Sequence, residues 1–166
     1  MLTRIALIAG LAAGTLAISA CSLTGNILDA TIDGTPWSAI NATVTNTGET
    51  MGVSTRVITG TNISETMTLT MVGIDGPGNW DIGSGEAPSA NLHFNINAVD
   101  IDTEWDCANN DDTPAGTLVI DTLDDNGASG TFSCTARDDA DNTIEVTNGV
   151  FDVSWGTSLP GIPGGV

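Results

Sequence analysis

Carboxylates are the most numerous side chains in this sequence that could hold an ion or move a proton. The 166 residues include 21 Asp and Glu but only three Lys and Arg. Six of these acids fall in two short segments that antiparallel strands would bring to one end of a sheet: Asp106, Asp111, Asp112, Asp138, Asp139 and Asp141. Calcium binds six to eight oxygens, although the D-x-[DN]-x-[DN]-G spacing of an EF-hand is missing here. A calcium site is therefore one hypothesis for these segments, and a solvated acidic surface that binds no cofactor is the other.

A second group of acids occupies alternate positions: Asp100, Asp102, Glu104 and Asp106. On a strand these four carboxylates share one face, and Val99, Ile101, Thr103 and Trp105 share the other. The pattern predicts a strand with one acidic face and one packed face, whose charge protects it from pairing with another chain.

Cys21 closes a segment with the features of an export signal. Arg4 supplies the positive start, and the apolar run from Ile5 to Ile18 is too short to span a bilayer. The stretch from Leu16 to Cys21 resembles the bacterial lipobox, in which the cysteine thiol receives a diacylglycerol and the chain is cleaved before it. We expect lipidation of Cys21, with simple secretion as the alternative. Stable anchoring takes two or more acyl chains.

Cys107 and Cys134 are the cysteines that remain. In an oxidising compartment two such cysteines are most simply a disulfide, with two buried free thiols as the alternative. A hairpin turn at 124–127 would place residues 116–117 opposite 134–135, at the end of the strand that receives Cys107. Zinc would need further nitrogen or sulfur ligands, and His93 is the only histidine in the sequence.

The charge balance excludes some partners. After Cys21 the chain has 21 acids and two arginines, so its formal charge there is 2 − 21 = −19. Such a surface repels nucleic acid and anionic lipid head groups. The length beyond the signal suits one domain. We expect a signal peptide over 1–20, a lipidated tether over 21–27, a domain over 28–157 and a flexible tail over 158–166.

The elements that would position these residues are almost all strands. Thr, Val and Ile dominate, and turn residues recur at short intervals, including Asp33-Gly34, residues 124–127 and Asn148-Gly149. Asn148-Gly149 is either a turn or a glycine bulge, because the apolar phase changes there. We expect strands near residues 30–32, 37–44, 53–59, 66–72, 80–82, 92–96, 117–123, 130–136, 143–147 and 150–155. After a signal-peptide helix, these strands predict an all-β antiparallel sandwich of nine to ten short strands, with an open or closed barrel as the alternative.

Four sequence elements resemble those of a family of uncharacterised bacterial envelope lipoproteins. They are IDG-x-x-W at 32–37, the segment Gly78-Asn79-Trp80-Asp81-Ile82-Gly83, GTFS-x-x-A at 130–136 and VTNG-x-F at 146–151. The resemblance implies an all-β lipoprotein and transfers no catalytic residue. The resemblance implies an apolar residue in many members of that family where this chain has Cys134, so it does not imply the second cysteine pair.

Catalytic patterns are weak in this sequence. His93 lies among asparagines on the polar face of its strand, which favours an exposed neutral histidine over a general base. No G-x-S-x-G or metalloprotease motif occurs. Trp37 and Trp155 are in apolar phase, which favours packing, whereas Trp80 and Trp105 are candidate contact residues. We expect no enzyme, with a carboxylate-based hydrolase as the alternative.

These observations predict a non-catalytic interaction or structural module, held by its lipid in the cell envelope. Ser22 after the cysteine favours the outer membrane. The expected partners are the membrane itself and an envelope protein or glycan. A calcium-dependent or carbohydrate-binding module and a small-molecule carrier remain alternatives, the carrier requiring an apolar cavity inside a barrel.

Overall fold

A single sheet of eleven strands makes up the fold. The computed structural model describes residues 25–50, 52–85, 87–96, 104–107 and 113–155, and Cys21 and the segment expected to be a signal peptide lie outside them. The strands are β1 (Ile27–Ile32), β2 (Thr35–Ser38), β3 (Asn41–Thr50), β4 (Val53–Thr61), β5 (Glu65–Val72), β6 (Gly78–Ile82), β7 (Ser89–Ile96), β8 (Glu104–Asp106), β9 (Gly116–Leu123), β10 (Gly127–Arg137) and β11 (Thr143–Ser154). The described part of the chain contains no helix of the length and apolar character needed to cross a membrane. The expected all-β class is confirmed.

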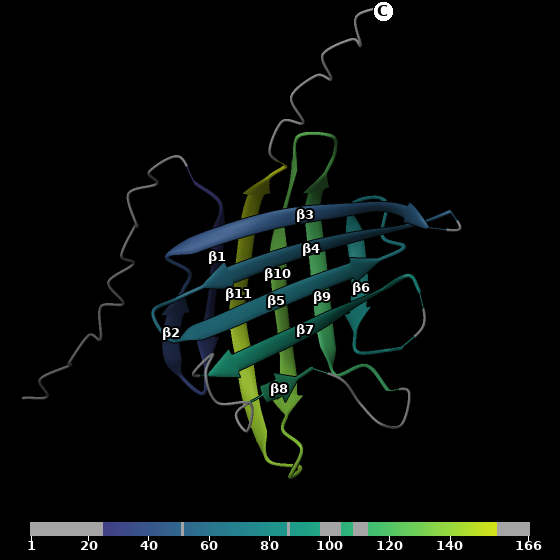
Figure 1. Ribbon diagram of the computed structural model, residues 1–166. Helices are drawn as coiled ribbons and strands as arrows, with labels where there is room; N and C mark the ends of the chain where they lie inside the picture. The colour runs from purple at the N-terminus through teal and green to yellow at the C-terminus, as the bar shows by residue number, and fades with distance from the viewer. Residues whose placement is uncertain (1–24, 51, 86, 97–103, 108–112, 156–166) are drawn as a thin grey trace, which may run out of the picture.

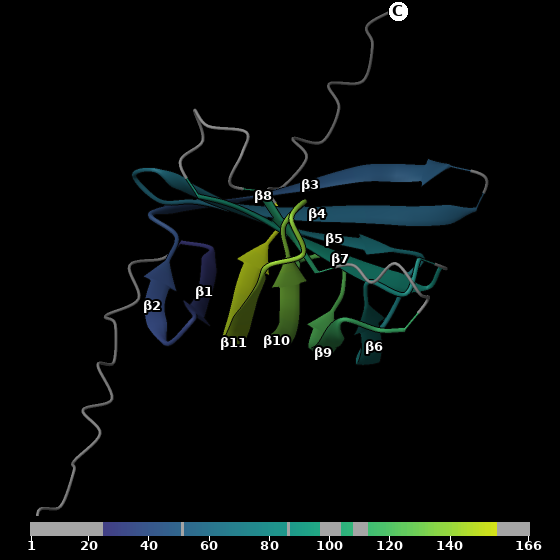
Figure 2. The same ribbon diagram turned by 90° about the horizontal axis from the view of Figure 1, so that it is seen from below.

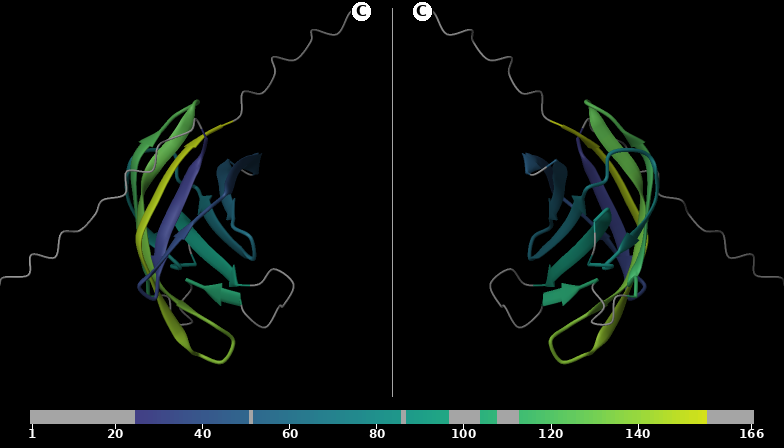
Figure 3. Two further views of the ribbon diagram at one scale, coloured as in Figure 1. Left: turned by 90° about the vertical axis from the view of Figure 1, so that its left-hand side faces the viewer. Right: turned by 90° about the vertical axis from the view of Figure 1, so that its right-hand side faces the viewer.

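The sheet folds over itself into two layers. Its strand order is β2-β1-β11-β10-β9-β6-β7-β5-β4-β3. Strands β3, β4, β5 and β7 form a front layer that crosses the back layer of β1, β11, β10, β9 and β6 at a steep angle (Figure 1). Figures 2 and 3 show the two layers from below and from the sides. The expected sandwich is therefore one bent sheet, and β3 and β2 are its two edges.

The short strand β8 joins the layers on one side. It pairs with β7 through residues 93–95 and with β10 through the single pair Arg137 and Asp106. The pairings β10-β9, β9-β6, β6-β7, β7-β8 and β8-β10 thus close a ring of five strands. The barrel alternative is therefore confirmed for these five strands. The remaining strands continue the sheet on both sides of the ring and form the sandwich part of the fold.

The core lies between the two layers and is apolar throughout its described part. Alternate residues of β5 point inward, so Met67, Leu69 and Met71 are buried and the threonines between them are half-buried. Trp37 meets Phe94 edge-on, with ring centroids 5.9 Å apart and an interplanar angle of 88°. This edge-to-face arrangement suits the charge distribution of aromatic rings. No charged side chain is buried among the described residues.

Three local predictions can be compared with the strands. Asp33 and Gly34 have φ of 46° and 77°, as a two-residue hairpin turn requires, and they join β1 to β2. Asn148 has φ of 51°, and the register of β10 against β11 shifts between Phe132 and Cys134. Of the two alternatives at Asn148-Gly149, the bulge is thus the one found, and β11 continues through it.

Two details of the pairing differ from expectation. The strand predicted over 37–44 is divided into β2 and β3, because the chain leaves the back layer at Ala39 and enters the front layer at Asn41. Strands β6 and β7 are parallel rather than antiparallel, paired at Ile82 and Ala90. Both differences arise where the chain passes between layers.

Candidate functional site

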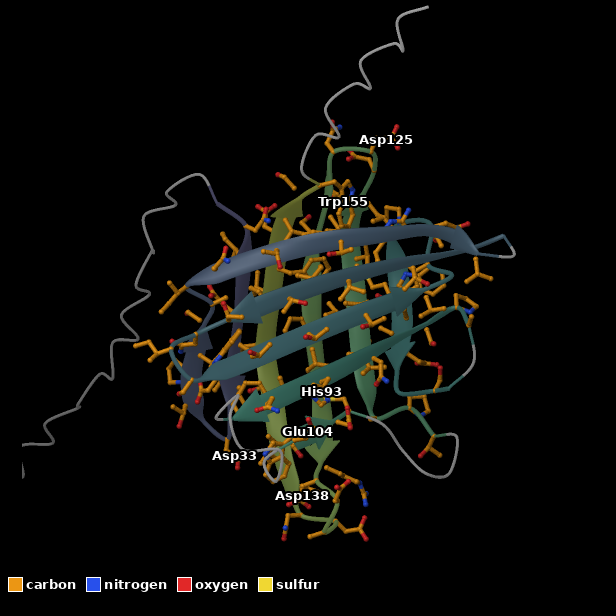
Figure 4. The ribbon with its side chains drawn as sticks, viewed as in Figure 1. Asp33, His93, Glu104, Asp125, Asp138 and Trp155 are labelled. Carbon is orange, nitrogen blue, oxygen red and sulfur yellow. A yellow bond between two sulfur atoms is a disulfide. The ribbon has the colours of Figure 1, made fainter. Side chains whose placement is uncertain are left out.

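The described acids of the two acidic segments lie toward one end of the molecule. Asp106 ends β8 and pairs in register with Arg137 of β10, which directly precedes the turn from Asp138 to Asn142. Figure 4 shows Asp138, Glu104 and His93 toward this end and Asp125 at the opposite one. Asp100, Asp102, Asp111 and Asp112 lie outside the described residues. Glu104 and Asp106 are exposed and Trp105 is half-buried between them, as the alternation predicts.

Asp138 uses its carboxylate to hold its own turn together. One oxygen accepts hydrogen bonds from the backbone N–H groups of Ala140 and Asn142, at 2.9 and 2.8 Å. The other accepts one from the Asn142 side-chain amide at 2.7 Å. These bonds, that of the Asn142 amide first, favour the ionised form and lower the pKa of Asp138. Asp124 does the same in the opposite turn, where the N–H groups of Asn126 and Gly127 lower its pKa.

The described carboxylates do not converge on an ion. Asp106, Asp138, Asp139 and Asp141 form no group of three or more ligands suited to a metal within the part of the chain that the structure describes. The sequence placed these acids at one end of the sheet. The sequence did not reveal that the Asp138 carboxylate accepts hydrogen bonds from the backbone of its own turn. These bonds leave fewer oxygen lone pairs available to a cation.

His93 and Asp106 form a pair across β7 and β8. The His93 Nδ1 lies 2.8 Å from an Asp106 carboxylate oxygen, and 36% of the His93 side chain is exposed. The expected exposed histidine is thus also oriented by an acid. Acyl transfer by a His–Asp pair needs a nucleophile within hydrogen-bond reach of the imidazole. Among the described residues, His93 makes no hydrogen bond to a hydroxyl or thiol, so the pair alone provides no nucleophile.

Cys107 and Cys134 form the expected disulfide. Their Cα atoms are 6.0 Å apart, and Cys134 lies opposite Gly116, within one residue of the predicted register. Both cysteines are buried in the core. The bond links the end of β8 to the middle of β10 and so supports the short strand that closes the ring.

A pocket opens at the edge between the layers. Its volume is about 270 Å³, and it is lined by Ile32, Asp33, Thr35, Pro36, Trp37, Glu65, Phe94 and Ile144. Trp37 is only 4% exposed, and its indole N–H has no hydrogen-bond partner in the described structure. Buried polar groups are normally paired, so this N–H is an uncommon feature. The pocket therefore combines an apolar lining with two carboxylates, and sequence reasoning assigned Trp37 to packing alone.

The other tryptophans are partly buried. Trp80 and Trp105, the candidate contact residues, pack against the core. Trp155 donates its indole N–H to the carbonyl of Asp124 at 2.6 Å, and Arg56 lies over its ring at 5.9 Å from the centroid. This hydrogen bond links the residue after β11 to the 124–127 turn.

The outward surface of the front layer is a regular array of side chains without carboxylates, most of them threonine or asparagine. Register pairs align Thr43, Thr59, Thr68 and His93 in one row across four strands. The neighbouring rows are formed in the same way, and we call the set the threonine face: Asn41, Thr43, Thr45, Val57, Thr59, Thr61, Thr66, Thr68, Thr70, Asn91, His93 and Asn95. None of these is acidic, although the chain has 21 acids.

Comparisons with known proteins identify the family but no activity. A search of the curated proteins found no match, and a search of the solved structures found none. A family model described as a domain of unknown function matches residues 25–153, which spans every strand except the last residue of β11. The chain therefore belongs to the family described as Domain of unknown function (DUF6252).

Proposed function

We propose that this chain is a lipid-anchored protein of the bacterial cell envelope whose domain is a non-catalytic interaction module. The lipobox at Cys21 supports the anchor, and the threonine face carries the assignment of the module. An array made mainly of short hydroxyl and amide side chains can contact a protein or glycan without burying a carboxylate, which would be costly. In a chain with a formal charge of −18, one neutral sheet face is the surface best suited to such a contact.

The lipid anchor is tested first, by alkyne-palmitate labelling in the native host and mass spectrometry of the membrane fraction. The Cys21 protein should carry acyl chains, and Cys21→Ser should lose both the label and the membrane association. Cys134→Ala is the matched control and should keep the label. An unmodified N-terminus on the exported wild-type protein would refute the anchor.

The contact surface is tested by placing a photo-crosslinking amino acid at Thr68 on the threonine face. Thr131 is the matched control, because it is an exposed threonine in the middle of β10 on the back layer. Thr68 should give adducts of defined mass in intact cells, and Thr131 should not. Equal crosslinking at both positions, or none at either, would contradict an interaction through this face.

A second candidate function is the binding of a small ligand in the pocket at Trp37. The specific observation is the combination of an apolar lining with Asp33 and Glu65, which fits an apolar molecule with a cationic group. Alkylammonium ions should raise the melting temperature more than sodium or alkyl carboxylates at equal ionic strength. Glu65→Gln should reduce that difference. Identical shifts for all these salts would remove this candidate.

A further inference from the structure

The chain enters the fold beside the loop that joins β2 to β3. The Asn26 side-chain amide donates to the carbonyl of Ala42 at 3.0 Å, and the N–H of Ala39 donates to the carbonyl of Leu28 at 3.0 Å. The loop containing Ile40 is thus held on both sides by the first described residues of the domain. Whatever tethers the chain upstream of Asn26 leaves from this point.

Two strongly exposed isoleucines lie at the same place. Ile40 is 73% exposed and Ile63 is 91% exposed, the highest values among the large hydrophobic side chains of the described residues. The N–H of Ile40 donates to the carbonyl of Thr61 at 2.8 Å, which puts the β2-β3 loop next to the β4-β5 turn that carries Ile63. Isolated exposed hydrophobic residues are common, but two together beside the chain entry form a local apolar tip.

The segment that carries this tip contains few charges, although Glu65 follows it directly at the start of β5. Residues 34–64 contain one acid, Glu49, and one base, Arg56, so the other 20 of the 21 acids lie elsewhere in the sequence. An anionic bilayer surface repels carboxylates within a Debye length of about 8 Å at physiological salt. Strands β3 and β4 contain one acid between them, Glu49, so an anionic membrane repels them less than it repels the turn from Asp138 to Asp141, which has three.

The tether would bring this edge to the membrane. Cys21 is five residues before Asn26, so a fully extended connection spans at most about 18 Å. With the lipid in the bilayer, Asn26 and the neighbouring loop stay within that distance of the surface. The first described residues of the chain and the exposed isoleucines lie on the same side of the domain.

We propose that Ile40 and Ile63 insert into the interface of the membrane in which the lipid of Cys21 is anchored, so that the domain sits with the edge of β3 and β4 against the bilayer. This inference rests on the proposed lipid anchor. It gives the domain a defined orientation, in which the Asp138 turn, at the end of the molecule opposite β3, is directed away from the lipid (Figure 4). Apolar side chains at an interface add to the binding that the acyl chains provide.

The test uses the full lipidated protein, in which the other cysteines are acylated or in the disulfide, so that an introduced cysteine is the single free thiol. Ile40→Cys, Ile63→Cys and the control Val150→Cys are labelled with an environment-sensitive fluorophore. Val150 is a suitable control because it is 43% exposed on β11 of the back layer. Each protein is reconstituted in phosphatidylethanolamine and phosphatidylglycerol vesicles with brominated acyl chains, and its acylation is verified by mass spectrometry.

The labels at 40 and 63 should show blue-shifted emission and several-fold stronger bromine quenching than the label at 150. Acylated protein with equal quenching at all three positions would overturn the inference and leave the lipid anchor intact. A blue shift that occurs without bromine quenching, and that disappears when the protein is diluted in lipid, would indicate contact with a second copy of the chain at the β3 edge. That result would also overturn the inference. A non-acylated Cys21 would refute the proposed anchor and the inference with it.

Discussion

The ring of Phe132 on β10 covers the backbone of Gly149 on β11. A Cβ atom at position 149 would lie 2.5 Å from two ring carbons of Phe132. Two pairs further along the register the roles of the strands are exchanged: Phe151 of β11 faces Gly130 of β10, and a Cβ at 130 would lie 2.8 Å from the Phe151 ring. The GTF and NG-x-F segments of the sequence are therefore two reciprocal glycine–phenylalanine pairs. Each ring packs in the space that a side chain would otherwise fill.

Gly149→Ala should destabilise the domain by about 1–3 kcal/mol, because the added methyl group forces the Phe132 ring out of a packed position. The free energy of unfolding in urea measures this. Gly76→Ala is the matched control, since a Cβ there meets nothing within 4 Å, and it should change stability by less than about 0.5 kcal/mol. Equal effects of the two substitutions would show that the ring does not restrict position 149.

Removal of the disulfide should cost the domain about 3 kcal/mol, because Cys107 and Cys134 close a loop of 27 residues in the unfolded chain. The double variant Cys107→Ala/Cys134→Ala avoids burying new polar groups at these core positions. Urea unfolding of this variant should match that of the reduced wild-type protein. Addition of reductant should leave the variant unchanged, and a large shift there would point to an effect unrelated to the bond.

The Asp138 turn should make stability depend on pH in the acid range. The pKa of Asp138 in the folded protein is lowered, so its contribution is complete above the ordinary Asp value of about 3.9 and is lost as the pH falls through the folded value. Asp138→Ala should therefore lower the melting temperature at pH 7, and its curve should converge with that of the wild type towards pH 2.

Asn142→Ala removes the largest cause of that shift and should flatten the same part of the pH curve. Thr131→Ala, an exposed change on the strand that leads to this turn, should keep the wild-type curve. If Asp138→Ala and the wild type differ by the same amount at every pH, ionisation of Asp138 is not what stabilises the turn.

Calcium should raise the melting temperature no more than magnesium or sodium chloride at matched ionic strength. The physical reason is that the described acids at this end, Asp106, Asp138, Asp139 and Asp141, do not form a set of ligands around one point. General screening of like charges would then account for any shift. A saturable increase specific to calcium, lost in Asp139→Asn/Asp141→Asn, would instead establish a site.

The sequence by itself determined the local structure of this protein. Alternation of apolar and polar residues located the strands, and the residues of the Asp33-Gly34 turn required the positive φ angles that are found there. The change of phase at Gly149 signalled either a turn or a bulge. The absence of other suitable partners made Cys107 and Cys134 a pair. Each of these features depends on interactions between residues close in sequence or on chemistry specific to a residue type.

The tertiary structure decided how distant strands meet. Period-two patterns indicate which face of a strand is buried but not which strand lies beside it. They therefore could not predict the bend into two layers, the parallel β6-β7 contact or the closure of the ring by β8. The same holds for the surfaces. The threonine face exists because four separate strands align in register, and the pocket at Trp37 exists because β1, β2, β5, β7 and β11 meet at one edge. Long-range pairing, which local sequence does not encode, created both.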